Sequence, residues 1–202
     1  MKLVHVETLI SIGKFSASRQ WKSVRAKLHR AIKAVDWPPG SKKFTIYPQS
    51  GKKRGEGNGV KPIKNECIKQ LLTQGWTTET QFADEKHSTL GGLDATLVTR
   101  NGMIAMEWET GNVSSSHRAL NKMALCLLRG QLAAATLVVP SRRLYRFLTD
   151  RIGNYSELEP YLDLWRSIPC TNGVLEIVVI EHDNESMSVP RIPKGTDGRS
   201  TN

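Results

Sequence analysis

The stretch "LDATLVTRNGMIAMEWE", from Leu93 to Glu109, mixes apolar and polar residues on either side of the dipeptide Asn101-Gly102. Asn-Gly is the dipeptide most favoured in two-residue hairpin turns, so the stretch predicts two antiparallel strands joined by a tight turn. If Arg100 pairs with Met103, the pairing of all other residues follows by counting outward from the turn. A one-residue bulge would change this pairing.

One face of the predicted hairpin gathers acidic side chains. In this register Asp94 lies opposite Glu109 and Thr96 lies opposite Glu107, and directly paired residues point to the same face of a sheet. The two glutamates would stand roughly 7 Å apart along their strand, with Asp94 roughly 5 Å across from one of them. The other face carries the apolar side chains Ile104, Met106 and Trp108.

Like charges this close repel one another, and the repulsion is costly unless a cation neutralises it. A divalent metal ion with oxygen ligands would do so, and Asp94, Glu107 and Glu109 therefore predict a metal site. The alternative interpretation is a solvent-facing hairpin whose polar face happens to be acidic.

The composition bounds the class of protein. With 202 residues, of which 39% are hydrophobic, the chain suits one compact domain over residues 1–202. The formal net charge is +10 and the pI is about 9.7, with dense basic spots at Gly51–Gly55 and Pro140–Arg146. This balance favours a polyanionic partner, either nucleic acid or an anionic membrane, while the alternative is a solvated basic surface.

Cysteine usage and the N-terminus indicate a cytoplasmic protein. Cys67, Cys126 and Cys170 lie far apart, which predicts reduced thiols that fill the core. The first residues, "MKLVHVETLISIG", are interrupted by charge, and no apolar run reaches the length of a membrane span. We therefore expect no membrane partner.

The rest of the chain alternates helix and strand signals. Helical spacing of apolar residues predicts helices over Arg19–Val35 and Ile63–Gln74, and a short strand is expected at Lys43–Pro48. Lys52–Asn58 reads as a glycine-rich basic loop. After the hairpin, Asn112, Ser114 and Ser115 open a helix with an apolar stripe at Leu120, Met123, Ala124, Leu127 and Leu128.

The conjunction of acidic and basic residues is typical of a nuclease. Carboxylates must hold Mg²⁺ against a phosphodiester while basic groups bind the rest of the DNA. An Asp followed by a strand with Glu-x-Glu, here Asp94 and Glu107-Trp108-Glu109, is the outline of restriction-type nucleases.

Longer motifs make the resemblance specific. The segments "DWPPGSKKFTI", "NGVKPIKNEC", "MEWETGNVSSSHRALNKM", "LTDRIGNYSELEPY" and "PKGTDGR" occur in this order. In sequence and spacing they resemble the BamHI family of type II restriction endonucleases, from about Trp37 to the C-terminus and more weakly before it. The resemblance implies an α/β fold in which a central mixed sheet is flanked by helices on both sides, the restriction-endonuclease-like core.

The resemblance also implies the catalytic residues, which fall on Glu79, Asp94, Glu107 and Glu109. Asp94, Glu107 and the Trp108 carbonyl would bind one Mg²⁺, and Asp94 with Glu79 would bind a second. Glu109 would be the general base or a group that orients the attacking water. Mn²⁺ is expected to substitute for Mg²⁺, and Ca²⁺ is expected to support DNA binding only. Read without the resemblance, Glu79 is an ordinary exposed glutamate.

DNA-reading residues follow from the same resemblance. Asn112, Ser114 and Arg118 would read base edges in the major groove, and Asp150 with Arg151 would read a C·G pair. Lys64 would be a further contact. A flexible C-terminal arm, about residues 191–202, would enter the minor groove through Gly195, Asp197 and Gly198. The alternatives are a helix N-cap at Asn112, a surface ion pair at Asp150 and Arg151, and a disordered terminus.

The implied function is cleavage of double-stranded DNA at the palindrome GGATCC after the first G, leaving a 5′ GATC overhang. A palindrome calls for a twofold homodimer, with the stripe at Leu120–Leu128 and a helix at Ser156–Arg166 as the expected interface. The alternative is that both elements pack on the core of their own chain. A companion DNA methyltransferase would protect the host. The alternatives are a related dimeric nuclease with another specificity and a sequence-specific DNA-binding protein that does not cleave.

Overall fold

A six-stranded mixed sheet forms the centre of the molecule, in the order β1-β7-β6-β5-β4-β3. The computed structural model describes residues 1–53, 55–83, 89–149 and 152–194. β5, β6 and β7 run parallel to one another, and the remaining neighbours in the sheet are antiparallel. The strands are β1 Lys2–Ile12, β3 Thr77–Ala83, β4 Thr89–Thr99, β5 Gly102–Trp108, β6 Ala134–Pro140 and β7 Gly173–Glu181.

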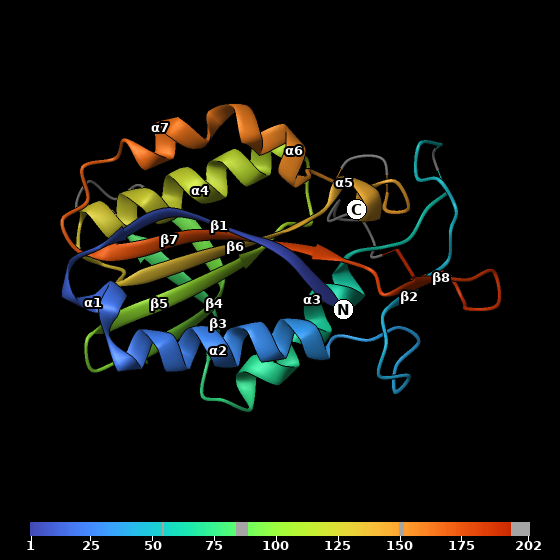
Figure 1. The fold of residues 1–202 in the computed structure, drawn as a ribbon, viewed down its shortest axis with the longest axis horizontal. Coiled ribbons are helices and arrows are strands. Elements are labelled where there is room, and N and C mark those ends of the chain that lie inside the picture. The colour runs from blue at the N-terminus through green and yellow to red at the C-terminus, as the bar shows by residue number, and fades with distance from the viewer. Residues whose placement is uncertain (54, 84–88, 150–151, 195–202) are drawn as a thin grey trace, which may run out of the picture.

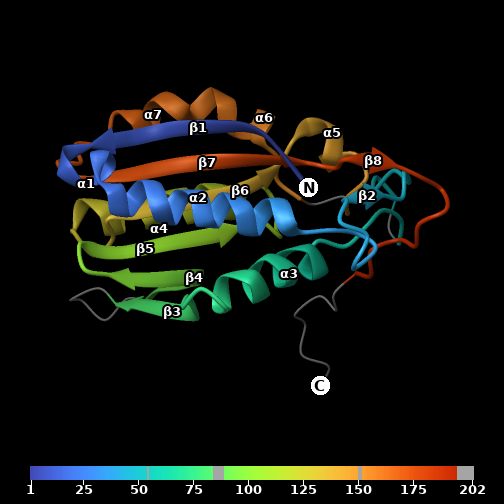
Figure 2. The ribbon, with the colours of Figure 1, turned by 60° about the horizontal axis from the view of Figure 1, so that its bottom comes forward.

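Helices cover both faces of this sheet (Figures 1 and 2). One face carries α1 Gly13–Ala17, α2 Arg19–Ala34 and α3 Lys61–Leu72. The other carries α4 Val113–Leu128, α6 Tyr155–Leu158, the 3₁₀ helix η1 Glu159–Tyr161 and α7 Leu162–Arg166. The predicted fold class, a mixed sheet with helices on both sides, is confirmed.

Each helical layer has its own apolar core. Leu28 of α2 and Cys67 of α3 are fully buried against Ile104 and Met106 of β5. On the opposite face, Leu120 and the rest of the α4 stripe pack against other sheet residues. That buried stripe comprises Leu120, Met123, Ala124 and Leu127. The two cores follow from the period-two alternation of β5, which sends consecutive side chains to opposite layers.

The central hairpin forms, but its register differs from the prediction by two residues. Thr99 pairs with Gly102, and Thr96 pairs with Ala105. Arg100 and Asn101 make the turn, while Gly102, at φ 121°, begins the second strand. The predicted pairs of Thr96 with Glu107 and of Asp94 with Glu109 are therefore wrong. A slip of two residues keeps every side chain on its predicted face, so the acidic face survives.

The expected helices at Arg19–Val35 and Ile63–Gln74 are confirmed as α2 and α3. The short strand at Lys43–Pro48 is β2, Thr45–Ile46, which pairs in parallel with β8, Asn184–Glu185. Ser156–Arg166 is not one helix but α6, η1 and α7 in succession, since Pro160 interrupts it. A short helix α5, Arg142–Tyr145, follows β6. The edge strand β1 was not predicted.

Two further expectations concern the thiols and the C-terminus. Cys67, Cys126 and Cys170 are free and buried, as expected for core residues. Ile192 is 1% exposed, and its carbonyl accepts a hydrogen bond from the Gly59 amide, so the chain is anchored at this point. An arm would therefore begin beyond Lys194. In the described part of the chain, no helix combines the length and apolarity that a membrane span requires.

Candidate active site

Asp94 and Glu107 lie side by side on β4 and β5 at the wall of a cleft. The Asp94 amide donates to Glu107 Oε2 at 3.2 Å, and Asp94 Oδ2 accepts a hydrogen bond from the Trp108 amide at 2.8 Å. The hairpin pairing just beyond Ala95 and Met106 brings these residues together. The cleft has a volume of about 500 Å³ and is also lined by Glu109 and by residues of α4.

Two lysines reach the carboxylates from the helices on either side of the sheet. Lys64 Nζ of α3 lies 2.7 Å from Asp94 Oδ1, and Lys122 Nζ of α4 lies 2.5 Å from Glu107 Oε1. Lys122 also donates to the Gly92 carbonyl at 2.5 Å. Both carboxylates are therefore neutralised by ammonium groups, which lowers the repulsion that the acidic face would otherwise carry.

The environment of Glu107 disfavours its charged form. Burial, and then the negative charge of Asp94, raises the pKa of Glu107 to about 7, against the opposing effects of the Lys122 hydrogen bond and charge. Carboxylates with shifted pKa values are common at functional sites. Burial of a carboxylate beside a like charge costs stability, and such an arrangement is retained where the chemistry requires it.

Glu109 ties the end of β5 to the start of α4. It is 4% exposed, its Oε1 accepts a hydrogen bond from the Gly111 amide at 2.5 Å, and its Oε2 accepts one from the Ser116 hydroxyl. Burial raises the pKa of Glu109, although these hydrogen bonds oppose the shift. A carboxylate with a raised pKa is better suited to accept a proton, but here both of its oxygens already accept hydrogen bonds.

Glu79 lies on β3, between Thr78 and Thr80, which pair with Ala95 and Leu93. Its strand position is thus opposite Asp94. The side chain is exposed and does not line the cleft. Its backbone has φ 54°, a left-handed conformation that costs of order 1–3 kcal/mol for a residue with a side chain. Such backbone strain is common at functional sites, and it is consistent with a functional role for Glu79.

Asp94 and Glu107 offer the hard carboxylate oxygens that Mg²⁺ prefers, with the Trp108 carbonyl adjacent in the chain. Within the described residues, however, no three His, Cys, Asp or Glu side chains are grouped so as to hold a metal ion. Lys64 and Lys122 occupy the oxygens that a metal would use. The donor chemistry fits a divalent cation, provided that these ammonium groups withdraw.

The comparisons with known proteins agree with this arrangement. Residues 1–199 match the family described as restriction endonuclease BamHI. The chain belongs to the BamHI family of type II restriction endonucleases. It is 42% identical over 200 residues to the type II restriction enzyme OkrAI from Oceanobacter kriegii, with 99% of each chain covered. It is 34% identical over 171 residues to the type II restriction enzyme BamHI from Bacillus amyloliquefaciens, covering 81% of this chain and 76% of that one.

A solved structure supports the fold independently. Restriction endonuclease BglII in complex with a DNA 16-mer matches with a TM-score of 0.62 at 11% identity, covering 91% of this chain and 79% of that chain. The predicted family, the restriction-endonuclease-like fold and the enzyme class, a type II site-specific deoxyribonuclease, are confirmed.

For a member of the BamHI family, the start of α4 is the region expected to read DNA. Asn112 is the N-cap, and its side chain accepts a hydrogen bond from the Ser115 amide at 3.2 Å. Ser114 and Arg118 are exposed on the first turns, and Arg118 lines the catalytic cleft. The N-cap interpretation of Asn112 is thus confirmed, and Arg118 lines the same cleft as the carboxylates.

The structure describes only some of the other residues that were expected to contact DNA. Lys64 pairs with Asp94, a residue that lines the cleft. Asp150 and Arg151, together with Gly195, Asp197 and Gly198, lie outside the described residues. Their neighbours are placed, however: the Gly153 amide donates to the Gly111 carbonyl at 2.8 Å, which fixes the segment after Arg151 against the start of α4.

Sequence reasoning missed Lys122 and Ser116. Lys122 lies between Asn121 and Met123, in a helix that was interpreted only by its apolar stripe, to which Lys122 does not belong. Its helical spacing of four from Arg118 puts both on one face, and this spacing was the available signal. Ser116 was one serine among three, and only the structure singles it out as the fully buried partner of Glu109.

Proposed function

We propose that this member of the BamHI family cleaves double-stranded DNA at GGATCC after the first G, leaving a 5′ GATC overhang, by metal-dependent hydrolysis. The observation that carries the proposal is the pair of carboxylates, Asp94 and Glu107, which share a cleft with the exposed Arg118 of α4. The proposed specificity rests on the 34% identity to the type II restriction enzyme BamHI and on the resemblance of the sequence motifs that contain Asn112, Asp150 and Arg151.

Asp94, Glu107 and the Trp108 carbonyl would hold one Mg²⁺, and Asp94 with Glu79 would hold a second. Bound metal ions of this kind polarise the scissile phosphate, lower the pKa of a water and stabilise the leaving oxygen. Mn²⁺ would substitute, whereas Ca²⁺ would support binding only. Until a metal binds, the ammonium groups of Lys64 and Lys122 balance the charge of the carboxylates, and their release is part of the proposed cycle.

Glu109 is proposed as the general base or the group that orients the attacking water. Its raised pKa supports this role. Gly111 and Ser116 each donate to one of its two oxygens, and a carboxylate oxygen has a second lone pair that could accept a proton from water. The Ser116 hydroxyl can rotate away, whereas the Gly111 amide is fixed by the backbone.

Base reading would come from Asn112, Ser114 and Arg118 at the start of α4 and from Asp150 and Arg151. An arginine clasps guanine O6 and N7 with two hydrogen bonds, and an aspartate accepts from cytosine N4. Lys64 would add a contact from α3. The terminal residues Gly195, Asp197 and Gly198 would approach the minor groove, where glycine permits close backbone contact.

A palindromic site requires two copies related by a twofold axis, so that each copy cuts one strand. We propose that the enzyme acts as a homodimer, and that a DNA methyltransferase with the same specificity protects the host. We also propose that the enzyme acts in the cytoplasm, where its three free cysteines would stay reduced.

The decisive experiment is digestion of a DNA with known sites, with Mg²⁺ and with EDTA, followed by sequencing of the ends. Ends that begin with GATC at every GGATCC, and only with Mg²⁺, are expected. Cleavage at another sequence would indicate a related nuclease with a different specificity. Specific binding without cleavage in any divalent metal would indicate a DNA-binding protein that does not cleave.

Glu107→Gln separates the metal site from DNA binding in the same assay. A metal ion contributes several kcal/mol to the transition state, and about 4 kcal/mol corresponds to a rate roughly 1,000-fold lower. The variant should therefore barely cut, while it still binds GGATCC in Ca²⁺, because the loss of a negative charge reduces repulsion of the phosphate. Near-normal cutting would show that another carboxylate is essential.

A further inference from the structure

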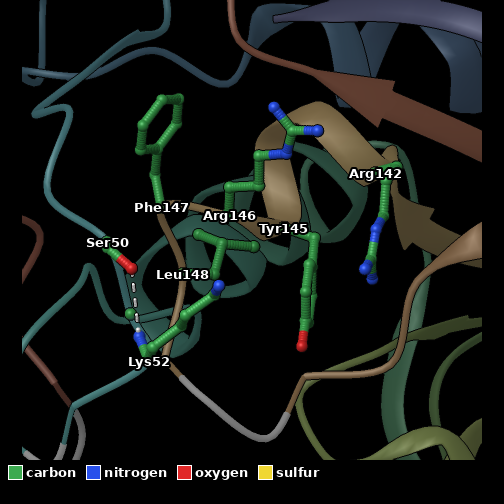
Figure 3. A pocket seen from close by; sticks show the side chains of 8 residues that line it. Ser50, Lys52, Arg142, Tyr145, Arg146, Phe147 and Leu148 are labelled. Carbon is green, nitrogen blue, oxygen red and sulfur yellow. Dashed lines mark hydrogen bonds between the residues drawn. The ribbon is translucent and has the colours of Figure 1, made fainter.

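A second cavity lies outside the carboxylate cleft, between the glycine-rich loop and α5. It has a volume of about 700 Å³ and is lined by Ser50, Gly51 and Lys52 on one side and by residues of α5 and the following segment on the other. The lining on that side comprises Arg142, Tyr145, Arg146, Phe147 and Leu148. Figure 3 shows Lys52, Arg142 and Arg146 around this pocket, and none of the described residues that line it is acidic.

The cations of this pocket lack acidic partners. Arg143, on the same short helix, pairs with Glu181 and Glu185 at 3.2 and 3.0 Å. Lys52, Arg142 and Arg146 form no ion pair with any described residue, and all three are exposed. Arg142 and Arg146 are four positions apart, a spacing at which like charges repel on a helix. This repulsion is relieved when an anion binds between them.

The pocket is also held in a fixed shape. The Gly51 amide donates to the Arg146 carbonyl at 3.1 Å, and the Asn58 amide donates to the Phe147 carbonyl at 2.8 Å. A side chain at Gly51 would place its Cβ 1.5 Å from the Leu148 carbonyl oxygen, so only glycine allows the two segments to approach this closely. The guanidinium of Arg142 lies 4.9 Å from the centre of the Tyr145 ring, which restricts its motion.

The position of the pocket relates it to DNA. β5 and β6 are parallel neighbours, so the carboxyl ends of both strands lie at one edge of the sheet. Glu107 lies near the end of β5. The helix α5, which begins at Arg142, follows the end of β6 after one residue (Figure 1). A duplex that enters the cleft from this edge would therefore extend towards the pocket.

In the sequence, the proposed reading pair lies between a residue of the pocket and a residue held beside the cleft. Leu148 lines the pocket, and the Gly153 amide donates to the Gly111 carbonyl next to Glu109, a residue of the cleft. Within the described part of the chain, the pocket and the cleft have no lining residue in common. If the pair reads the outer base pair, the next DNA that the pocket can meet is the backbone flanking the hexamer.

We propose that Lys52, Arg142 and Arg146 bind a backbone phosphate of the DNA outside the six base pairs of the recognition site, an inference that rests on the proposed function. Paired guanidinium groups suit a phosphate oxyanion because each can donate two parallel hydrogen bonds. The contact carries no sequence information, but it fixes the segment that leads into Asp150 and Arg151 against the duplex.

The test compares two duplexes that contain GGATCC. One ends close to the hexamer, and the other extends by about one helical turn, roughly 10 base pairs, on each side. The wild-type protein should bind the long duplex more tightly. The variant Arg142→Gln/Arg146→Gln should lose about tenfold in affinity for the long duplex and little for the short one. Its salt dependence on the long duplex should become shallower by about 0.9 in slope for each pocket.

Lys27→Gln/Arg30→Gln is the matched control, because it removes the same charge from exposed positions of α2, which covers the sheet away from the pocket. It should leave the difference between the duplexes intact. Equal weakening of both duplexes by Arg142→Gln/Arg146→Gln, or no weakening, would overturn the pocket assignment while GGATCC cleavage by the wild-type protein stands. Absence of specific binding by the wild-type protein would overturn the proposed function and the pocket with it.

Discussion

At the scale of single residues, Lys122 and Glu107 form a largely buried ion pair in the candidate active site. Their charged atoms are 2.5 Å apart, and the side chains are 10% and 14% exposed. Removing one partner of a buried pair leaves an uncompensated charge, which costs about 3 kcal/mol or more. In EDTA, Lys122→Met should therefore lower the free energy of unfolding by about 3 kcal/mol.

Divalent metal should repair this defect. Because Ca²⁺ can neutralise Glu107 in place of the ammonium group, the stability lost by Lys122→Met should be largely recovered when Ca²⁺ is added. Denaturant titrations in EDTA and in Ca²⁺ measure both values. Lys69→Met is the control, since Lys69 and Glu66 form an exposed pair at 3.3 Å whose loss should change stability by under about 1 kcal/mol. An equal loss of stability in EDTA and Ca²⁺ would assign Lys122 to packing alone.

Arg151 is the residue that we propose links the sequence to specificity. A bidentate contact to an outer guanine is worth roughly 1 to 3 kcal/mol of discrimination in each half-site. Arg151→Ala should weaken binding to GGATCC far more than binding to a scrambled duplex, because phosphate contacts elsewhere supply the non-specific affinity. Paired titrations at one salt concentration measure the two affinities. Lys should not restore discrimination fully, because an ammonium group lacks the planar fork. Equal losses would make Arg151 a backbone contact.

The individual residues also show what could be predicted from sequence. The acidic face was predictable because side chains alternate along a strand, and Asp94 and Glu107 do meet. The neutralising lysines were not predictable, since Lys64 and Lys122 belong to two helices whose packing on the sheet decides which side chains reach the cleft. Those contacts depend on tertiary structure, and local spacing carries little information about them.

At the scale of elements, the hairpin was predicted in the wrong register, yet its acidic face was predicted correctly. The turn moved from Asn101-Gly102 to Arg100-Asn101, and every pair shifted by two residues. Parity decides which face a side chain occupies, so an even shift preserved the acidic face, whereas a shift of one would have buried the carboxylates. β1 was harder to predict, because it is an edge strand with two register shifts and its apolar residues do not alternate regularly.

The contact between the start of α4 and the segment 152–154 would couple the proposed catalytic residue Glu109 to the proposed base-reading residue Arg151. Glu109 binds Gly111, and Gly111 binds Gly153 just after Arg151. A Cβ on Gly153 would lie 2.7 Å from Ser116 Oγ and 3.0 Å from the Val113 Cα. Gly153→Ala should therefore push this segment away from α4 and lower stability by about 1–3 kcal/mol.

The informative readout for Gly153→Ala is discrimination rather than stability. If the contact positions Arg151, the ratio of cognate to scrambled affinity should fall, while the scrambled duplex binds as before. Denaturant unfolding and the paired titrations measure the two effects on one preparation. A variant that is destabilised but discriminates normally would show that the contact serves packing only.

At the scale of the whole molecule, the expected interface needs revision. The stripe of α4 was predicted to meet a second copy, but Leu120, Met123 and Leu127 are buried in the core of their own chain. That interpretation of the stripe is wrong, because an amphipathic helix on a sheet first covers the sheet. What remains outside is Leu128, 45% exposed at the end of α4, with Tyr161 at 49% and Leu164 at 62% on η1 and α7.

These exposed residues lie on one helical layer, since α4 and α7 contact each other over the same face of the sheet (Figure 1). Arg166 is engaged within its own chain, where it binds Glu7 and Asp163 at 2.8 Å each. The ionic contribution of this layer to a dimer is correspondingly reduced. Dimerisation through α4 and α7 would therefore depend mainly on apolar contact.

Leu164→Glu tests this surface, because it places a charge in the apolar contact, where burial without a partner is costly. Its dimer dissociation constant should rise at least about tenfold, equivalent to about 1.4 kcal/mol, in sedimentation velocity. Val98→Glu is the control, since Val98 is 73% exposed on the hairpin strand β4, away from this layer. On a supercoiled plasmid the wild-type dimer should cut both strands in one encounter, whereas Leu164→Glu should accumulate nicked circles, because one copy reaches only one strand. If Leu164→Glu stayed dimeric and linearised the plasmid as the wild type does, the twofold contact would have to lie on another face of the molecule.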